Sequence, residues 1–232
     1  MKNVVFLILI LISYIGNSQS DKLDNFDTDY QYREDQFYAS VTYNIINHKP
    51  SGVSQSGFSS GFNIGFIRDM PINKNRNIAF GIGLGLSSNS YNQKNLLIEE
   101  VANGVTFTII DEDDYDVSKN KFTTYLIEVP FEFRWRTSNA EDYNFWRIYT
   151  GFKVGYLLYN SVKFESETLN SNLYNSGSFE KLQYGLTLSA GYSTWNFYLY
   201  YGLNPIFDSS LKLEESGIEM KPINIGLMFY IL

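Results

Sequence analysis

Six charged side chains occupy the polar positions of two neighbouring segments that have a period of two. Along residues 125–136 and 146–158, apolar or aromatic residues alternate with polar or small ones, and the charges stand among the latter. An ion-pair network that fills an interior is one interpretation, because buried charges must be paired. A polar binding site or a narrow conduction path is the other. The six residues are Glu128, Glu132, Arg134, Arg136, Arg147 and Lys153.

The other residues with chemical potential form weaker motifs. His48 is the only histidine, and no nucleophile motif accompanies it, so we interpret it as a solvated loop residue. The acidic run at 111–116 lacks the spacing and the glycine of a calcium-binding loop. The glycines within 81–85 alternate with apolar residues, which indicates a strand and not a dinucleotide fingerprint. We therefore expect no catalytic residue, no metal site and no cofactor.

The elements that must hold the six charges are strands. Eight segments place apolar and aromatic residues on one face and polar or small residues on the other, and most run nine residues or more. A tilted strand needs about nine to eleven residues to cross a bilayer. The predicted strands cover residues 37–45, 58–66, 77–87, 125–136, 146–158, 181–192, 196–203 and 223–231.

The direction of the apolar face separates two kinds of barrel. A soluble barrel of the lipocalin type points it inward, whereas a membrane barrel points it toward lipid and keeps a polar lumen. Glycine recurs on the polar face, as at Gly81, Gly83 and Gly85, and suits a crowded interior better than an outer surface. We therefore predict that the apolar face contacts lipid.

The connections between the strands agree with this choice. Three links are short (68–76, 137–144 and 193–196), and the four that alternate with them are mostly longer and more polar. Short turns at one end and long loops at the other are typical of outer-membrane barrels with both termini in the periplasm. The predicted fold is an all-β, eight-stranded antiparallel up-and-down transmembrane β-barrel of the outer-membrane type.

The amino terminus predicts export. Lys2 precedes an apolar run, and Gly16, Asn17 and Ser18 then favour signal-peptide cleavage before Gln19. An uncleaved amino-terminal anchor is the less favoured alternative, since the run is short for a membrane span. We expect a signal peptide at 1–18, a periplasmic segment at 19–36 and the barrel at 37–232.

Charge and cysteine content exclude several classes of protein. Without Lys2 the chain has 17 basic residues (18 minus one) against 25 acidic ones, a net charge of −8. Nucleic acids and nucleotides are therefore not expected partners, because phosphate binding favours clustered Lys and Arg. The absence of cysteine excludes disulfides and a cysteine-linked lipid anchor.

Two strands and their turn carry a more specific resemblance. The segment IEVPFEFRWRTS at 127–138, followed by FWRIYTGFKVGY at 145–156, resembles the PorT family of the Bacteroidetes. Related porin-like barrels of that phylum share the EVP strand start. The resemblance implies an outer-membrane barrel that supports type IX protein secretion, and gliding motility where present, without catalysis. It implies outer-membrane lipid and other envelope or secretion-system proteins as partners.

Two other function classes stay open. A generic outer-membrane barrel for adhesion or envelope integrity has the same sequence features. A small-solute channel or ligand-binding barrel is also compatible with them, although the six inward charges make a continuous cavity less favoured.

Overall fold

The computed structural model describes residues 35–101, 104–110, 116–137, 145–213 and 216–231, which belong to one compact unit, Gln31–Leu232. Within these ranges, no helix has the length and apolar character needed to cross a membrane.

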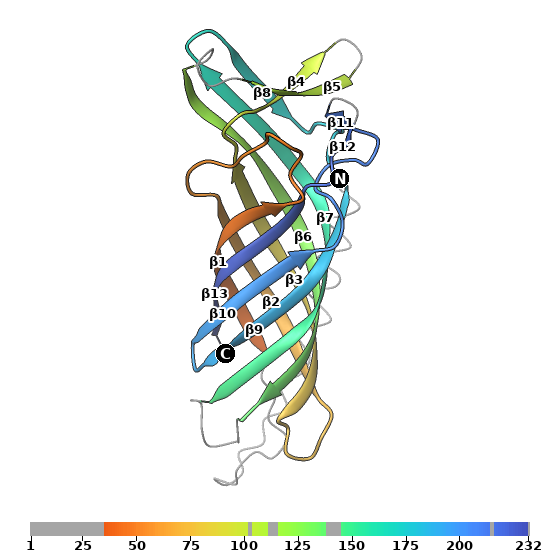
Figure 1. Cartoon of the computed structure of the whole chain (residues 1–232). Helices are drawn as coiled ribbons and strands as arrows, with labels where there is room; N and C mark the ends of the chain where they lie inside the picture. Colours follow the sequence, from red (N-terminus) through yellow and green to blue (C-terminus); the bar gives the residue numbers. More distant parts are fainter. Residues whose placement is uncertain (1–34, 102–103, 111–115, 138–144, 214–215, 232) are drawn as a thin grey trace, which may run out of the picture. The chain divides into compact units, whose positions relative to one another are not determined.

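Eight antiparallel strands close into a barrel in which each barrel strand pairs with the next along the chain (Figure 1). The first and last strands complete the closure, pairing from Phe37↔Ile231 to Asn47↔Lys221. The predicted fold class is confirmed. The barrel strands are β1 (Gln36–Asn47), β2 (Ser60–Pro71), β3 (Ile78–Asn92), β6 (Val117–Arg136), β7 (Trp146–Ser166), β9 (Leu182–Tyr192), β10 (Trp195–Gly202) and β13 (Lys221–Ile231).

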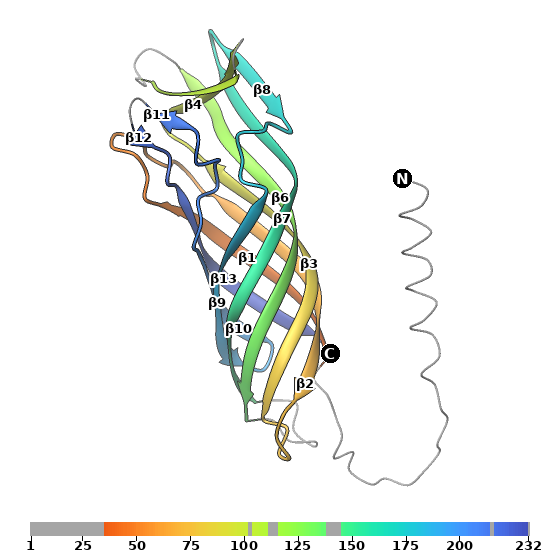
Figure 2. The ribbon, with the colours of Figure 1, turned by 90° about the vertical axis from the view of Figure 1, so that its right-hand side faces the viewer.

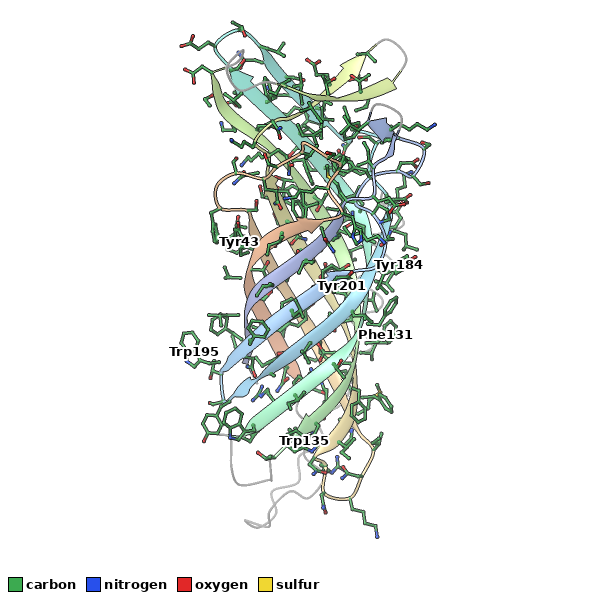
Figure 3. The ribbon with its side chains drawn as sticks, viewed as in Figure 1. Tyr43, Phe131, Trp135, Tyr184, Trp195 and Tyr201 are labelled. Atoms are coloured by element: carbon green, nitrogen blue, oxygen red, sulfur yellow. The ribbon has the colours of Figure 1, made fainter. Side chains whose placement is uncertain are left out.

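The outer face of the barrel is apolar, and the inner face is polar. On β2 and β3, Phe62, Ile64 and Leu84 are more than half exposed, whereas Asn63 and Ser87 between such residues are buried. The prediction that the apolar face points outward is therefore confirmed, and the lipocalin-type alternative is wrong. Apolar and aromatic side chains, among them Phe131 and Trp195, point outward from the barrel wall (Figure 3).

Aromatic side chains mark the two borders of this apolar face. Trp135, Trp146 and Trp195 lie beside the short turns and are exposed. Toward the long loops, the rings of Tyr125 and Tyr159 lie side by side on β6 and β7, tilted by 55° to each other. From residue 125 to residue 135, β6 advances about 33 Å at roughly 3.3 Å per residue, which becomes about 25 Å along the barrel axis at a tilt of about 40°. That height matches the apolar band of outer-membrane barrels.

Five short strands lie outside the barrel wall, all at the long-loop end (Figures 1 and 2). The sequence had predicted plain loops over these residues. Here β4 pairs with β5, β11 pairs with β12, and β8 extends the sheet beyond β7. These strands are β4 (Leu96–Val101), β5 (Gly104–Ile109), β8 (Asn170–Tyr174), β11 (Lys212–Leu213) and β12 (Ser216–Gly217).

Strands β6 and β7 also run beyond the predicted limits, to 20 and 21 residues, roughly twice what a bilayer needs. An irregularity in their register explains why the alternation ended at Leu158. Tyr125 pairs with Tyr159, but Leu126 pairs with Leu157, so Leu158 is an extra residue. A bulge of this kind reverses which residues point outward. Leu158 and Tyr159 are both exposed, and from there the odd-numbered residues of β7 face out.

Strand β2 differs from its prediction at both ends. It begins at Ser60, so Phe58 precedes it, and it continues to Pro71 through residues that had been assigned to a turn. This continuation pairs Asp69 with Gly81 on β3 and turns the Asp69 side chain into the lumen.

Pro130 stands in the middle of β6, where it has no N–H to donate. The β3–β6 pairing lapses at this position: it runs to Ile82↔Phe131 and resumes at Gly85↔Glu128. A Cβ on Gly83 would lie 3.1 Å from Cγ of Pro130, so the glycine lets the two strands pass closely.

We expect Gly151→Ala to destabilise the barrel by about 1–3 kcal/mol, the usual range for overpacking. A Cβ there would overlap the carbonyl oxygen of Phe131, a backbone atom that cannot rotate away. Urea unfolding in lipid vesicles measures the change. Gly177→Ala is the matched control, because a Cβ at Gly177 meets no atom within 4 Å. Equal stability of the two variants would contradict the close approach of β6 and β7.

Candidate functional site

The structure places all six predicted charges on the inner face of β6 and β7, where each side chain is between 0% and 7% exposed. Glycines on the flanking strands provide the room. Glu132 lies between Gly81 and Gly151, and Glu128 lies between Gly85 and Gly155.

Asp69 is the centre of the network at the short-turn end, and the sequence reading had missed it. Arg136 donates to both of its carboxylate oxygens, from Nη1 and Nη2, at 2.8 Å each. Arg134 donates from Nη1 to Oδ1 of Asp69 and from Nε to Glu132, both at 3.0 Å. Asp69, Arg134 and Arg136 are each fully buried. Charge-assisted and bidentate bonds of this kind are the strong ones in proteins.

Glu128 and Lys153 form a second ion pair farther along the lumen. Lys153 Nζ lies 2.9 Å from Glu128 Oε2, and Ser87 Oγ donates to Glu128 Oε1 at 2.7 Å. The Lys153 ammonium also lies 4.5 Å from the ring centroid of Tyr200, within cation–π range. Both charges are therefore partnered inside the barrel.

Arg147 is held by aromatic rings. Its guanidinium carbon lies 4.5 Å from the ring centroid of Phe145 and 5.4 Å from that of Tyr230. Among the described residues, its Nε and Nη1 atoms have no hydrogen-bond acceptor. It faces Arg136 across the β6–β7 pair.

Tyrosines occupy much of the remaining lumen. A buried cluster combines Tyr38, Ile67, Tyr149, Tyr198, Tyr200, Met228 and Tyr230. The cavity beside Glu128 and Lys153 has a volume of about 10 Å³. A space of roughly 10–15 Å³ holds one water molecule. The interior of the barrel is thus packed with side chains around the ion pairs.

The long loops fold into a second, apolar core above the barrel, which we call the cap. Phe122 of β6 is fully buried there against the rings of Tyr91, Phe179 and Phe207. Side chains from all four long connections join this core, among them Val53, Ile98, Phe107, Leu173, Leu213 and Met220. The cap covers the long-loop end of the polar lumen with packed apolar residues.

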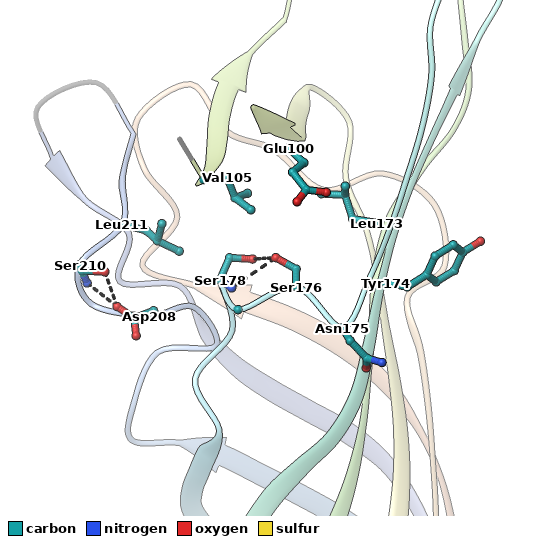
Figure 4. A pocket seen from close by; sticks show the side chains of 12 residues that line it. Glu100, Val105, Leu173, Tyr174, Asn175, Ser176, Ser178, Asp208, Ser210 and Leu211 are labelled. Carbon is teal, nitrogen blue, oxygen red and sulfur yellow. Dashed lines mark hydrogen bonds between the residues drawn. The ribbon is translucent and has the colours of Figure 1, made fainter. Parts of the chain in front are cut away.

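A pocket of about 430 Å³ opens in the cap between β4, β5, β8 and the loop that follows β10 (Figure 4). Leu173, Val105 and Leu211 give it apolar walls, and Glu100 and Asp208 give it carboxylates. Its size lies in the usual range for ligand sites, about 300–1,000 Å³.

Polar groups of this pocket are ordered by short hydrogen bonds. The Ser176 and Ser178 hydroxyls lie 2.6 Å apart. Ser210 donates its hydroxyl and its N–H to Asp208 at 2.5 and 2.8 Å, and these bonds hold the pKa of Asp208 below its usual range. The pocket therefore offers an ionised carboxylate and ordered hydroxyls beside apolar walls.

The structure also shows where the three weaker sequence motifs lie. His48 is exposed in the loop after β1, and its imidazole has no hydrogen bond within the described ranges. Of the acidic run at 111–116, residues 111–115 lie outside the described residues. The glycines at 81–85 are part of β3, as predicted. No group of three or more side chains suited to a metal ion occurs in the part of the chain that the structure describes.

The family model of the outer membrane protein beta-barrel domain matches residues 17–208, most of the chain. The chain belongs to this family. It is therefore a β-barrel protein of the bacterial outer membrane.

Solved structures similar to this barrel include Ail, the attachment invasion locus protein of Yersinia pestis. It is 12% identical, with a TM-score of 0.37, and the match covers 87% of this chain and 100% of Ail. Ail in complex with the heparin analogue sucrose octasulfate is 14% identical, with a TM-score of 0.36 and coverage of 85% and 99%. A mutant of the Rh. blastica porin is 9% identical, with a TM-score of 0.15 and coverage of 86% and 100%. No curated protein sequence matches the chain.

Proposed function

We propose that this barrel is a non-catalytic outer-membrane component that supports type IX protein secretion by docking another envelope protein on its cap. The observation that carries the proposal is the folded cap itself, which presents an ordered pocket of about 430 Å³ outside the membrane band. Loops that bind partners are commonly held by a rigid scaffold, and here the extended β6 and β7 supply one.

The packed lumen favours docking over conduction. Its buried ion pairs, its tyrosines and the apolar core of the cap leave a cavity of only about 10 Å³ beside Lys153. A conducting path needs a continuous water-filled lumen, which larger barrels have. Secretion as the specific process is supported by the PorT resemblance of residues 127–138 and 145–156.

The domain organisation belongs to the same proposal. Cleavage between Ser18 and Gln19 would release a signal peptide of residues 1–18 and leave residues 19–36 in the periplasm before the barrel. The intact mass of protein purified from outer membranes tests the cleavage position.

We expect Gly177→Trp to reduce secretion at least tenfold while leaving the barrel folded. Gly177 lines the pocket, and no atom lies within 4 Å of a Cβ built on it, so a large side chain fits there without displacing the chain and changes the surface of the pocket. A deletion strain complemented with the variant measures secreted protein in the medium. A boiling-dependent shift in gel mobility, compared at matched expression, shows that the barrel has folded.

Gly217→Trp is the matched control. Gly217 has the same open surroundings but does not line the pocket, so secretion should be unchanged. Equal secretion in both variants would contradict docking at the pocket. A deletion strain that secretes normally but becomes sensitive to detergent would instead assign the barrel to envelope integrity.

A further inference from the structure

Two lysines face each other on the outer surface of the barrel, just above the apolar band. Lys121 of β6 pairs with Lys163 of β7, and both point to the outer face because they share the side of Tyr125 and Tyr159. The register continues the row to Asn92 on β3 and Asn172 on β8. Four neighbouring strands thus present amides and ammonium groups at one level.

The charges of this lysine pair are not neutralised within the described residues. Neither Lys121 nor Lys163 is in an ion pair, whereas Lys119, in the next outward row, pairs with Glu165 at 2.7 Å. The hydrogen bond from Lys119, with further contributions from the charges of Lys163 and Lys121, lowers the pKa of Glu165. Three lysines therefore surround one carboxylate. Like charges directly opposite each other on a sheet are destabilising.

The height of Lys121 and Lys163 above the apolar band identifies the kind of anion that would neutralise them. Tyr125 and Tyr159 lie in contact two outward rows below, at the position of an interfacial aromatic belt. Lys121 lies four residues beyond Tyr125, about 13 Å along the strand and roughly 10 Å along the barrel axis. Lysine stems reach back toward the headgroup region from such positions.

We propose that Lys121 and Lys163 clamp the phosphate group of a lipid in the outer leaflet of the membrane. The two ammonium groups neutralise the phosphate from both sides, and Asn92 and Asn172 flank it in the same row. Thr123 and Ser161 form the next outward row below the pair, where the Thr123 hydroxyl donates to Ser90. The clamp explains why two like charges face each other on a chain with a large excess of acidic residues.

The test compares the full-length protein with Lys121→Gln/Lys163→Gln in two kinds of vesicle. One is pure phosphatidylcholine, and the other adds a diacylated lipid with a phosphate monoester headgroup. Binding of that lipid to the detergent-solubilised barrel, measured with a fluorescent analogue, should weaken on the order of thirty-fold in the double variant. Lys74→Gln/Lys212→Gln removes the same charge from exposed positions and should bind like the wild type.

Stability provides a second readout that a merely structural role would not produce. In phosphatidylcholine the double variant should be at least as stable as the wild type, because the repulsion is gone. In vesicles with the phosphorylated lipid, the wild type should become the more stable of the two. No crossing of the two stabilities, or equal lipid binding in both variants, would overturn the clamp. Displacement of the lipid by millimolar inorganic phosphate would overturn the assignment to a lipid and indicate a free-anion site.

Discussion

Replacing Asp69 with Asn is expected to destabilise the barrel by about 3–5 kcal/mol, the range for removing one partner of a buried ion pair. Asn keeps the size of the side chain but removes the charge that the Arg134 and Arg136 guanidiniums share. All three side chains have no exposed surface, so water cannot replace the lost carboxylate. The free energy of unfolding, measured in lipid vesicles by the fluorescence of the three tryptophans, shows the change.

Two further variants make this result specific to Asp69. Asp116→Asn removes the same charge at an exposed position before β6 and should change stability by no more than about 0.5 kcal/mol. Asp69→Asn/Arg136→Gln removes a positive charge as well and should recover part of the loss. If Asp69→Asn unfolds at the same urea concentration as Asp116→Asn, the two arginines do not depend on this carboxylate.

The second large effect is expected at the Glu128–Lys153 pair. Glu128→Gln or Lys153→Met alone should each lose about 3–5 kcal/mol, because each leaves the other charge buried without its partner. The double variant should lose much less than the sum of the two. This difference is the coupling energy of the pair, and a double-mutant cycle in vesicles measures it.

The Lys119–Glu165 pair is a matched control for that cycle. It joins the same two residue types at 2.7 Å, against 2.9 Å inside the barrel, but its side chains are 44% and 35% exposed. Its coupling should be far smaller than that of the buried pair, as for other solvent-exposed pairs. Equal coupling in the two cycles would show that the lumen is as well hydrated as the surface.

The sequence alone predicted the barrel and the outward direction of its apolar face, because both depend on the alternation of apolar and polar residues along each strand. Residues two apart on a strand share a face, so an apolar face against a glycine-rich polar face specifies lipid outside and a packed interior. The same parity placed Glu128, Arg134 and Lys153 among the inward residues before any pairing between strands was known.

The tertiary structure decided what depends on the partners of each strand. The sequence places Asp69 in a polar turn. In the structure β2 continues to pair with β3 as far as Asp69 and Gly81, and Asp69 therefore accepts hydrogen bonds from Arg134 and Arg136. The extra residue at Leu158 reversed which residues of β7 point outward, so the alternation seen in the sequence could not be followed beyond Leu158.

The cap, too, could not be predicted from the alternation of residues along the sequence. Val53, Phe107, Phe179 and Met220 come from four different connections and form one core only after the barrel brings those connections to the same end. Contacts between residues so far apart leave no periodic signal in the chain. The alternation of residues along each strand thus specified the wall of this barrel. Long-range packing formed the cap over the long-loop end and brought Asp69 into the charge network of the lumen.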